Sequence, residues 1–134
     1  MPIRYCCKFT FPPFKWNRFT NFIYIIRINK PNINPVVEGT PQGALNDVII
    51  FPYNDIERTL NILDQYADEI ACVLIDPVPH RVGLFSATNA FIKAIYKWTR
   101  KNDALMVFDE VVTYRVNYAG AQESYTCKPD LTAM

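Results

Sequence analysis

The sequence lacks the features that mark a membrane protein, a secreted protein or a metal site. Its longest apolar stretch, residues 22–28, is interrupted by Arg27 and is far too short to span a bilayer. Pro12 and Pro13 stand where a signal peptide would have its apolar core, and no small-residue cleavage site follows. The four cysteines form neither a CxxC pair nor a zinc-like spacing. We therefore expect a cytoplasmic chain with no membrane contact and no metal site.

Charge is distributed unevenly, although the net charge of the 134 residues is only +1. Residues 1–38 carry six basic residues and one acidic residue, a net charge of +5, whereas residues 39–134 carry eight basic and twelve acidic residues, a net charge of −4. Aromatic residues among the cations of the first segment could bind single-stranded nucleic acid, but no nucleic-acid-binding motif accompanies them. We expect no nucleic-acid partner, and we predict that residues 1–38 are a poorly ordered or non-native leader to a globular unit at residues 39–134.

Short apolar runs predict three strands, at residues 46–52, 70–75 and 104–112, because each is bounded by charge, proline or turn residues. Helical periodicity fills both gaps between them. Strands that alternate with helices predict an α/β fold, with a parallel sheet built from βαβ crossovers and strands buried on both faces. Asp76 and Asp109 each end a strand, so we expect them to emerge at the same edge of that sheet, where open α/β sheets bind ligands.

The first helix is predicted to begin with Asn54 as its cap and Glu57 at capping-box spacing. The second ends in basic residues, which suit the negative end of the helix dipole. Each helix has an apolar face that we expect to point into the core. These faces comprise Ile56, Leu60, Leu63 and Ala67 in the first helix, and Phe91, Ile92, Ile95 and Trp98 in the second.

Asp109-Glu110 at the end of an apolar run is open to more than one interpretation. In a Walker B strand the aspartate would hold Mg²⁺ of a bound nucleotide and the glutamate would position water, but the chain has no Gly-x-x-x-x-Gly-Lys-Ser/Thr loop. A non-catalytic α/β module binding Mg²⁺-nucleotide, or a fragment of a P-loop NTPase, remains the alternative function. A purely structural role is also open, because an acid that ends a strand can cap the next turn.

A third interpretation comes from several short segments whose order and spacing extend from about Asp47 to Met134. They are Pro52-Tyr53-Asn54-Asp55, Asp76-Pro77 with Gly83, Phe108-Asp109-Glu110-Val111, Gly120-Ala121-Gln122 and Pro129-Asp130-Leu131-Thr132. In these segments the chain resembles the class-III aminotransferases, and among them the glutamate-1-semialdehyde 2,1-aminomutase-like group.

The resemblance implies part of the large domain of a fold-type-I enzyme that uses pyridoxal 5'-phosphate, acts on small-molecule amino donors and acceptors and works as a homodimer. Asp109 matches the residue that binds the pyridinium nitrogen of the cofactor in this family. A carboxylate at that position favours the protonated ring, which is the electron sink of the reaction. Val111, expected on the same strand face, matches the aliphatic residue that packs against the ring.

Two positions near the expected cofactor depart from the family pattern. Asp76 stands where much of the family has glutamate, which shortens that carboxylate by one methylene. Arg81 stands where many aminomutases have an asparagine that contacts the phenolic oxygen of the cofactor, and His80, the only histidine, lies beside it. We include Asp76, His80 and Arg81 with Asp109 and Val111 as candidate cofactor-binding residues.

The resemblance also implies a Schiff-base lysine just past the Asp-Leu-Thr segment, after Met134. None of the seven lysines in the chain occupies that position. The glycine-rich segment that cradles the phosphate and the small domain of the family have no match either. We therefore predict an internal fragment that contains no catalytic residue and is inactive as an isolated chain, since amine transfer by this route needs the lysine.

Overall fold

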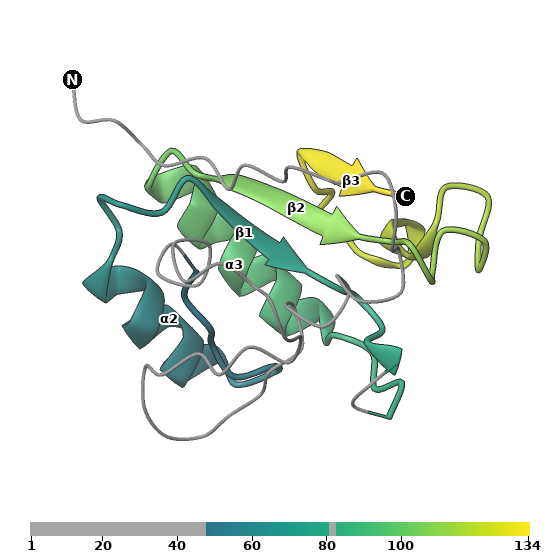
Figure 1. Ribbon diagram of the computed structural model, residues 1–134, viewed down its shortest axis with the longest axis horizontal. Coiled ribbons are helices and arrows are strands. Elements are labelled where there is room, and N and C mark those ends of the chain that lie inside the picture. The colour runs from purple at the N-terminus through teal and green to yellow at the C-terminus, as the bar shows by residue number, and fades with distance from the viewer. Residues whose placement is uncertain (1–47, 81–82) are drawn as a thin grey trace, which may run out of the picture.

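The computed structural model describes residues 48–80 and 83–134, so the predicted leader, residues 1–38, and Arg81 lie outside the described residues. The described elements are α2 (Ile56–Gln65), β1 (Cys72–Ile75), α3 (Asn89–Lys101), β2 (Leu105–Asp109), the short 3-10 helix η3 (Ala121–Ser124) and β3 (Leu131–Ala133) (Figure 1). No helix within these residues is long and apolar enough to cross a membrane.

The three strands form one parallel sheet in the order β1-β2-β3. In this sheet Ile75 pairs with Phe108, and Asp109 pairs with Ala133. Helix α3 connects β1 to β2, which is the βαβ arrangement that the alternation of strands and helices predicts. The prediction of an α/β fold with a parallel sheet is confirmed, and all three strands end at the same edge (Figure 1).

The predicted strand at residues 46–52 is wrong in its described part, because residues 48–52 have no strand structure. Phe51 packs against α3 instead, with the Phe51 and Phe91 ring centroids 6.4 Å apart. The Pro52 carbonyl accepts a hydrogen bond of 2.8 Å from the Thr59 hydroxyl in α2. In the described sheet β1 pairs with β2 alone, so residues 48–52 do not extend the sheet at its outer edge.

The cap of α2 is Asp55, one residue later than predicted, and its side chain accepts a hydrogen bond of 3.1 Å from the Arg58 N–H. Asn54 has a φ of 61° and lies outside the helix. Its amide donates to the Ser86 carbonyl at 3.1 Å, and its side-chain oxygen accepts from the Thr88 N–H at 2.9 Å. Because Thr88 is the cap of α3, Asn54 connects the beginnings of the two helices.

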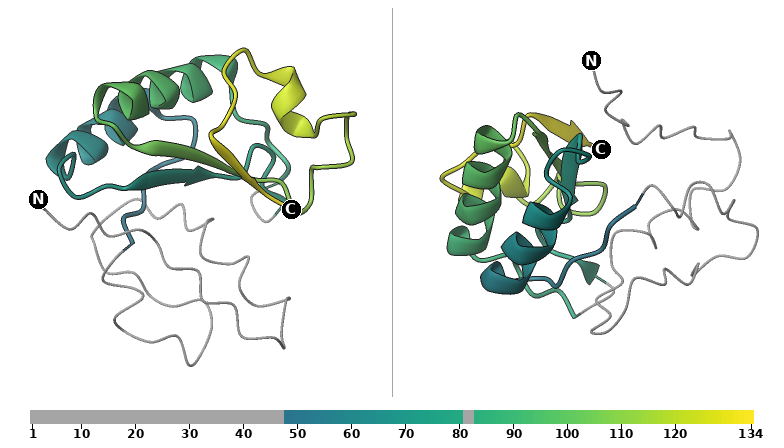
Figure 2. Two further views of the ribbon diagram at one scale, coloured as in Figure 1. Left: turned by 90° about the horizontal axis from the view of Figure 1, so that it is seen from above. Right: turned by 90° about the vertical axis from the view of Figure 1, so that its left-hand side faces the viewer.

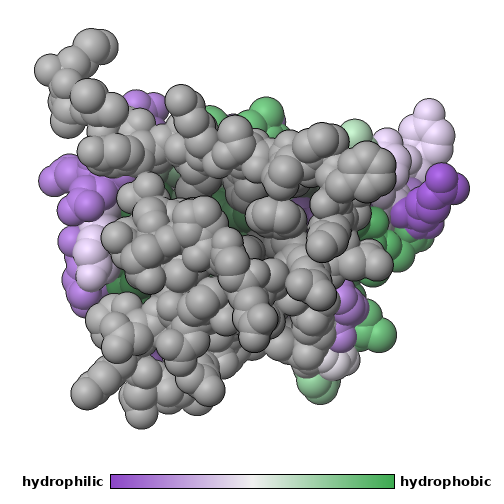
Figure 3. Space-filling view, viewed as in Figure 1, coloured by the Kyte–Doolittle hydropathy of each residue, from purple (hydrophilic) through white to green (hydrophobic). Residues whose placement is uncertain are grey.

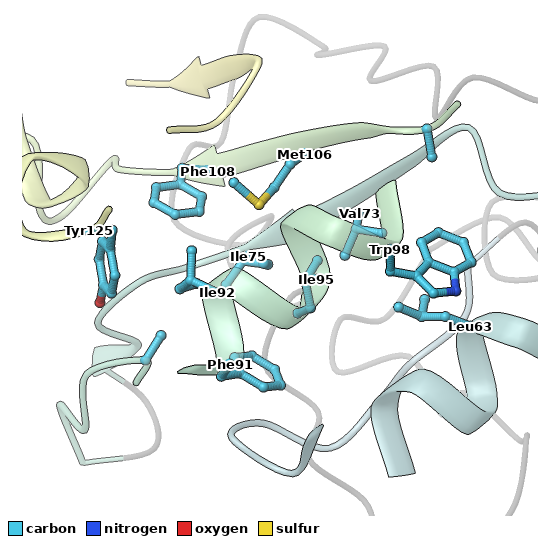
Figure 4. Close-up of a cluster of buried hydrophobic side chains, with 12 residues drawn as sticks. Leu63, Val73, Ile75, Phe91, Ile92, Ile95, Trp98, Met106, Phe108 and Tyr125 are labelled. Carbon is cyan, nitrogen blue, oxygen red and sulfur yellow. The ribbon is translucent and has the colours of Figure 1, made fainter. Parts of the chain in front are cut away.

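The hydrophobic core lies between the sheet and the two helices, and both helices lie on the same side of the sheet (Figures 2 and 4). Strand β2 therefore alternates, with Met106 and Phe108 fully buried and Leu105 44% exposed. The expectation that β2 is covered on both faces fails at Leu105, whereas Val107 is half-buried and Asp109 is buried on that same face. The predicted helix faces are confirmed, since Leu63, Phe91, Ile92, Ile95 and Trp98 are buried and Ile56, Leu60 and Ala67 pack against them.

Candidate active site

Two buried carboxylates lie at the ends of neighbouring strands. Asp76 follows β1 directly, and Asp109 is the last residue of β2. Ile75 and Phe108 are register partners that point into the core, so the next residue of each strand points to the opposite face, away from α3. Asp76 is 3% exposed and Asp109 is 6% exposed. The prediction that both acids emerge at one edge of the sheet is confirmed.

The environment of Asp76 opposes its ionisation. The pKa of the Asp76 carboxyl is raised to about 7. Burial is the main cause, and the negative charges of Asp109 and Glu110 also raise the pKa, whereas a hydrogen bond of 2.7 Å from the Val78 N–H lowers it. A carboxyl with a pKa near 7 can hold or release a proton under ordinary conditions. The negative charge of Asp109 therefore acts on the protonation of Asp76.

Asp109 is also less acidic than an ordinary aspartate. Burial raises its pKa, whereas a hydrogen bond of 3.1 Å from the Val111 N–H and the nearby His80 lower it. The contact with Val111 is the turn-capping role that the structural interpretation predicted, and it engages one oxygen of the carboxylate. A buried anion is stabilised by a cationic hydrogen-bond donor, so a cation beside Asp109 would favour its ionised form.

Of the other candidate cofactor-binding residues, Val111 lies differently from the prediction, and the role of His80 stays a prediction. Val111 does not continue the strand face, because β2 ends at Asp109 and the chain turns there, with the Tyr114 N–H donating to the Glu110 carbonyl at 2.9 Å. That part of the prediction is wrong, and Val111 is 46% exposed in the turn beside Asp109. His80 is exposed and close enough to lower the pKa of Asp109.

The lysines of the described region serve other purposes. Lys93, Lys97 and Lys101 are exposed on α3, which packs on the sheet face opposite Asp109. The Lys128 ammonium donates to backbone carbonyls at the end of η3, at 2.8 Å to Gln122 and 3.0 Å to Tyr125. That none of them is the Schiff-base lysine stays a prediction.

Two tyrosines that sequence reasoning did not select support the turn after β1. The Tyr53 hydroxyl donates to the Pro77 carbonyl at 3.0 Å, and the Tyr125 hydroxyl donates to the same oxygen at 3.2 Å. Burial raises the pKa of both hydroxyls, so they stay protonated and remain donors. The sequence offers no signal for this role, because the acceptor is a backbone atom more than twenty residues away from Tyr53.

The segment after β2 presents apolar residues to solvent. Val111 is 46% exposed, Val112 51% and Val116 61%. Figure 3 shows hydrophobic surface beside hydrophilic side chains at this end of the molecule. A shallow hollow here is lined by Tyr114, Arg115, Asn117 and Tyr118, and includes neither of the two paired aspartates.

The parallel sheet and its helices place the chain in the α/β class, and its two buried acids lie at the strand ends where open α/β sheets bind ligands. A model of the family "Aminotransferase class-III" matches residues 27–134. The chain belongs to the class-III aminotransferases, and the prediction of this family is confirmed.

The chain is 40% identical over 99 residues to a glutamate-1-semialdehyde 2,1-aminomutase of Sulfurihydrogenibium sp. strain YO3AOP1, covering 73% of this chain and 23% of the relative. Among solved structures it resembles an omega-transaminase from Sphaerobacter thermophilus, with 42% identity, a TM-score of 0.69 and coverage of 73% of this chain and 22% of the other. A transaminase described with PLP bound is 40% identical, with a TM-score of 0.68 and coverage of 72% and 23%.

The described sheet and helices thus have the α/β fold of the fold-type-I aminotransferases, as predicted. The chain spans a little under a quarter of the length of these relatives. The match from residue 27 includes part of the predicted leader, and the division near Glu38 stays a prediction.

Proposed function

We propose that this chain is part of a pyridoxal-phosphate-dependent aminotransferase or aminomutase, in which Asp109 binds the ring nitrogen of the cofactor. The observation that carries the proposal is the buried pair of carboxylates at the edge of β1 and β2, where Asp109 has one oxygen bonded to the Val111 N–H. The family match and the PLP-bound relative support the choice of cofactor.

The physical argument is that burial makes the Asp109 anion costly, and a cation would remove that cost. A ring N–H⁺ held against the carboxylate is stabilised by charge and by hydrogen bonding, and each unit by which the ring pKa rises corresponds to about 1.4 kcal/mol. When bound, pyridoxal phosphate supplies the electron sink for chemistry at the carbon that carries the amine. The contribution of Asp109 is to hold the proton on the ring nitrogen.

The neighbouring residues complete the proposed site. Asp76, whose protonation the charge of Asp109 affects, limits how much negative charge accumulates at the edge because it can remain protonated. Val111, exposed beside Asp109, offers an aliphatic surface for the ring. His80 supplies a positive influence on Asp109. Arg81 is proposed as a donor to the phenolic oxygen on resemblance alone.

The activity of the whole protein is proposed from its relatives. The parent enzyme would move an amino group between small-molecule donors and acceptors, or within one molecule as the aminomutase relatives are named to do. We propose that it works as a homodimer in the cytoplasm, and that residues 39–134 contribute to its large domain while residues 1–38 form a separate leader. These proposals rest on the resemblance, and the leader also rests on the break in charge.

Ring protonation is the test of the role of Asp109. The full chain is titrated with 4-deoxypyridoxine 5'-phosphate, which has no aldehyde and so cannot react with surface lysines, and the absorbance of the bound ring reports its protonation. We expect a protonated ring in the wild type and a neutral ring or no binding in Asp109→Asn. Asp68→Asn, an exposed aspartate in a turn, is the matched control and should behave as wild type.

Two results would overturn the proposal: no binding by the wild-type chain, or the same ring protonation in Asp109→Asn. Titration with Mg²⁺-ATP examines the Walker B alternative, which would gain support from nucleotide affinity that Asp109→Asn abolishes. Inactivity of the isolated chain is tested separately by borohydride reduction in the presence of pyridoxal phosphate. Stoichiometric labelling of a single lysine, together with turnover of an amino donor, would contradict it.

A further inference from the structure

Glu110 is a fully buried carboxylate that the proposed chemistry does not use. Its side chain is 0% exposed and points to the side of the sheet opposite Asp109, because the two residues are adjacent. Glu110 Oε2 accepts a hydrogen bond of 2.6 Å from the Ala121 N–H, and Oε1 accepts one of 3.1 Å from the Gln122 N–H. A carboxylate that accepts two backbone hydrogen bonds is satisfied without a cation.

The backbone beside Glu110 leaves no room for a side chain at position 120. A Cβ on Gly120 would collide with Glu110 Oε2 and lie 2.9 Å from Glu110 Cδ. Gly120 also has a φ of +80° and a ψ of −175°, a conformation that is essentially restricted to glycine. The glycine and the glutamate therefore form one unit, in which the close approach of the backbone allows both amides to reach the carboxylate.

This unit closes the base of a loop formed by residues 111–119, which we call the 111–119 loop. Glu110 itself is tied to β3, since its N–H donates to the Ala133 carbonyl at 2.8 Å. Gln122 extends the connection, because its side-chain amide donates to the Thr132 hydroxyl at 3.3 Å. The loop begins and ends on the same buried carboxylate.

The loop has little packing to determine its conformation. Most of its side chains are exposed, from Tyr114 at 42% to Tyr118 at 99%. Apolar contacts stabilise a conformation only in proportion to the area they bury. The conformation of this loop therefore depends more on the hydrogen bonds at its base. The loop includes Val111, whose N–H donates to Asp109.

We propose that Glu110 is a positioning residue that fixes the 111–119 loop through Gly120, Ala121 and Gln122, and thereby sets where Val111 lies relative to Asp109. The hydrogen bonds from the Ala121 and Gln122 amides to Glu110, which we call the anchor, are independent of the cofactor. Only its consequence, that Val111 and Asp109 are held ready for a ring, rests on the proposed function. Glu110 therefore acts through the loop rather than on a bound molecule.

Hydrogen exchange of individual backbone amides in the full chain tests the anchor without any cofactor. In Glu110→Gln, which keeps the length of the side chain and one acceptor, we expect the protection of the Ala121 and Gln122 amides together to fall by about tenfold or more. The protection of the Val111 amide should fall with it, while amides of β1 and α3 keep wild-type protection. Glu69→Gln, an exposed glutamate in the turn after α2, is the matched control and should leave all of these amides unchanged.

Unchanged exchange at Ala121 and Gln122 in Glu110→Gln would overturn the proposal. Loss of protection throughout the sheet would also overturn it, because Glu110 would then support the whole fold rather than position the loop. A failure to bind the cofactor analogue leaves these exchange results intact, so the two proposals can fail separately.

A double-mutant cycle tests whether Glu110 and Gly120 act as a unit. We expect Gly120→Ala to lower the unfolding midpoint of the full chain by about 10 °C. In the Glu110→Ala background the same substitution should lower it by clearly less, since the collision with the carboxylate is gone and only backbone strain remains. Equal losses in the two backgrounds would show that the two residues are independent and would contradict the proposal.

Discussion

The helix side of the sheet and its carboxyl edge are built on opposite principles. On the helix side Phe91, Ile95 and Met106 are buried at 1% exposure or less, and their packing needs no polar partner. At the edge Asp76 and Asp109 are buried as well, but burial raises the pKa of both carboxyls. The same degree of burial therefore stabilises one region and makes the other dependent on protons or on a cationic ligand.

The difference shows how the fold can tolerate a site that is unfavourable by itself. Burial of apolar side chains contributes about 25 cal/mol per Å², and the two helices and the sheet supply that area on one side (Figure 4). Asp76 and Asp109 lie on the other face, so a change in their charge leaves the core packing untouched. The apolar core and the buried carboxylates thus lie on different faces of the same strands.

The largest expected effect comes from breaking the core. Phe91→Ala should lower the free energy of unfolding by about 3–5 kcal/mol, because it removes a fully buried ring that contacts Phe51 and Tyr53. Phe85→Ala is the control, since Phe85 is 70% exposed, and should change it by less than about 0.5 kcal/mol. Urea unfolding measures both, and similar losses in the two variants would contradict the assignment of the core.

The core was largely predictable from the sequence, whereas the edge was predictable only in part. The spacing of Phe91, Ile92, Ile95 and Trp98 predicts a buried helix face because helical geometry alone determines which residues share a side. The positions of Asp76 and Asp109 followed in the same way from the ends of two apolar runs. Local pattern is sufficient wherever a single element determines the outcome.

The features that the sequence did not predict depend on contacts between distant segments. Residues 48–52 have the composition of a strand, but Phe51 packs on α3, and Asn54 bridges to the start of α3 instead of capping α2. In the sequence Glu110 is simply the residue after Asp109, yet its side chain accepts hydrogen bonds from backbone amides eleven and twelve residues further along the chain. Each outcome was determined by a partner that no local periodicity reveals.

A change in pH should alter the free energy of unfolding by an intermediate amount, through the carboxylates at the carboxyl edge of the sheet. The pKa of Asp76 is raised from 3.8 in the unfolded chain to about 7 in the folded chain, so between these values the folded state binds more protons. The contribution of Asp76 to the free energy of unfolding is therefore fully present below about pH 4. It is lost as the pH rises towards 7, by an amount on the order of a few kcal/mol. The raised pKa of Asp109 acts in the same direction.

Asp76→Asn isolates this contribution. The asparagine stays neutral and can still accept the Val78 N–H, so the variant should be more stable than wild type at pH 8 and nearly equal to it at pH 4. Urea unfolding at the two pH values measures the change, with Asp68→Asn as the exposed control. A variant that is equally stabilised or destabilised at both pH values would contradict the raised pKa and remove the contrast with the core.

The smallest expected effect compares one buried hydroxyl from each region. Thr59 in α2 is 0% exposed and donates to the Pro52 carbonyl at 2.8 Å, whereas Thr113 in the 111–119 loop is 3% exposed and its hydroxyl has no hydrogen-bond partner in the described part of the chain. Substitution by valine keeps the shape and removes the hydroxyl. Thr59→Val should lower the free energy of unfolding by about 1 kcal/mol, since the hydrogen bond to Pro52 is lost.

Thr113→Val should leave that free energy unchanged or raise it by up to about 1 kcal/mol, because a buried donor without a partner is replaced by a methyl group. Both variants replace threonine by valine, so the difference between their free energies of unfolding reports only the surroundings of the two hydroxyls. Equal losses would mean that the Thr113 hydroxyl is hydrogen-bonded in the folded chain. The difference between the core, where the Thr59 hydroxyl is hydrogen-bonded, and the carboxyl edge would then depend only on Asp76 and Asp109.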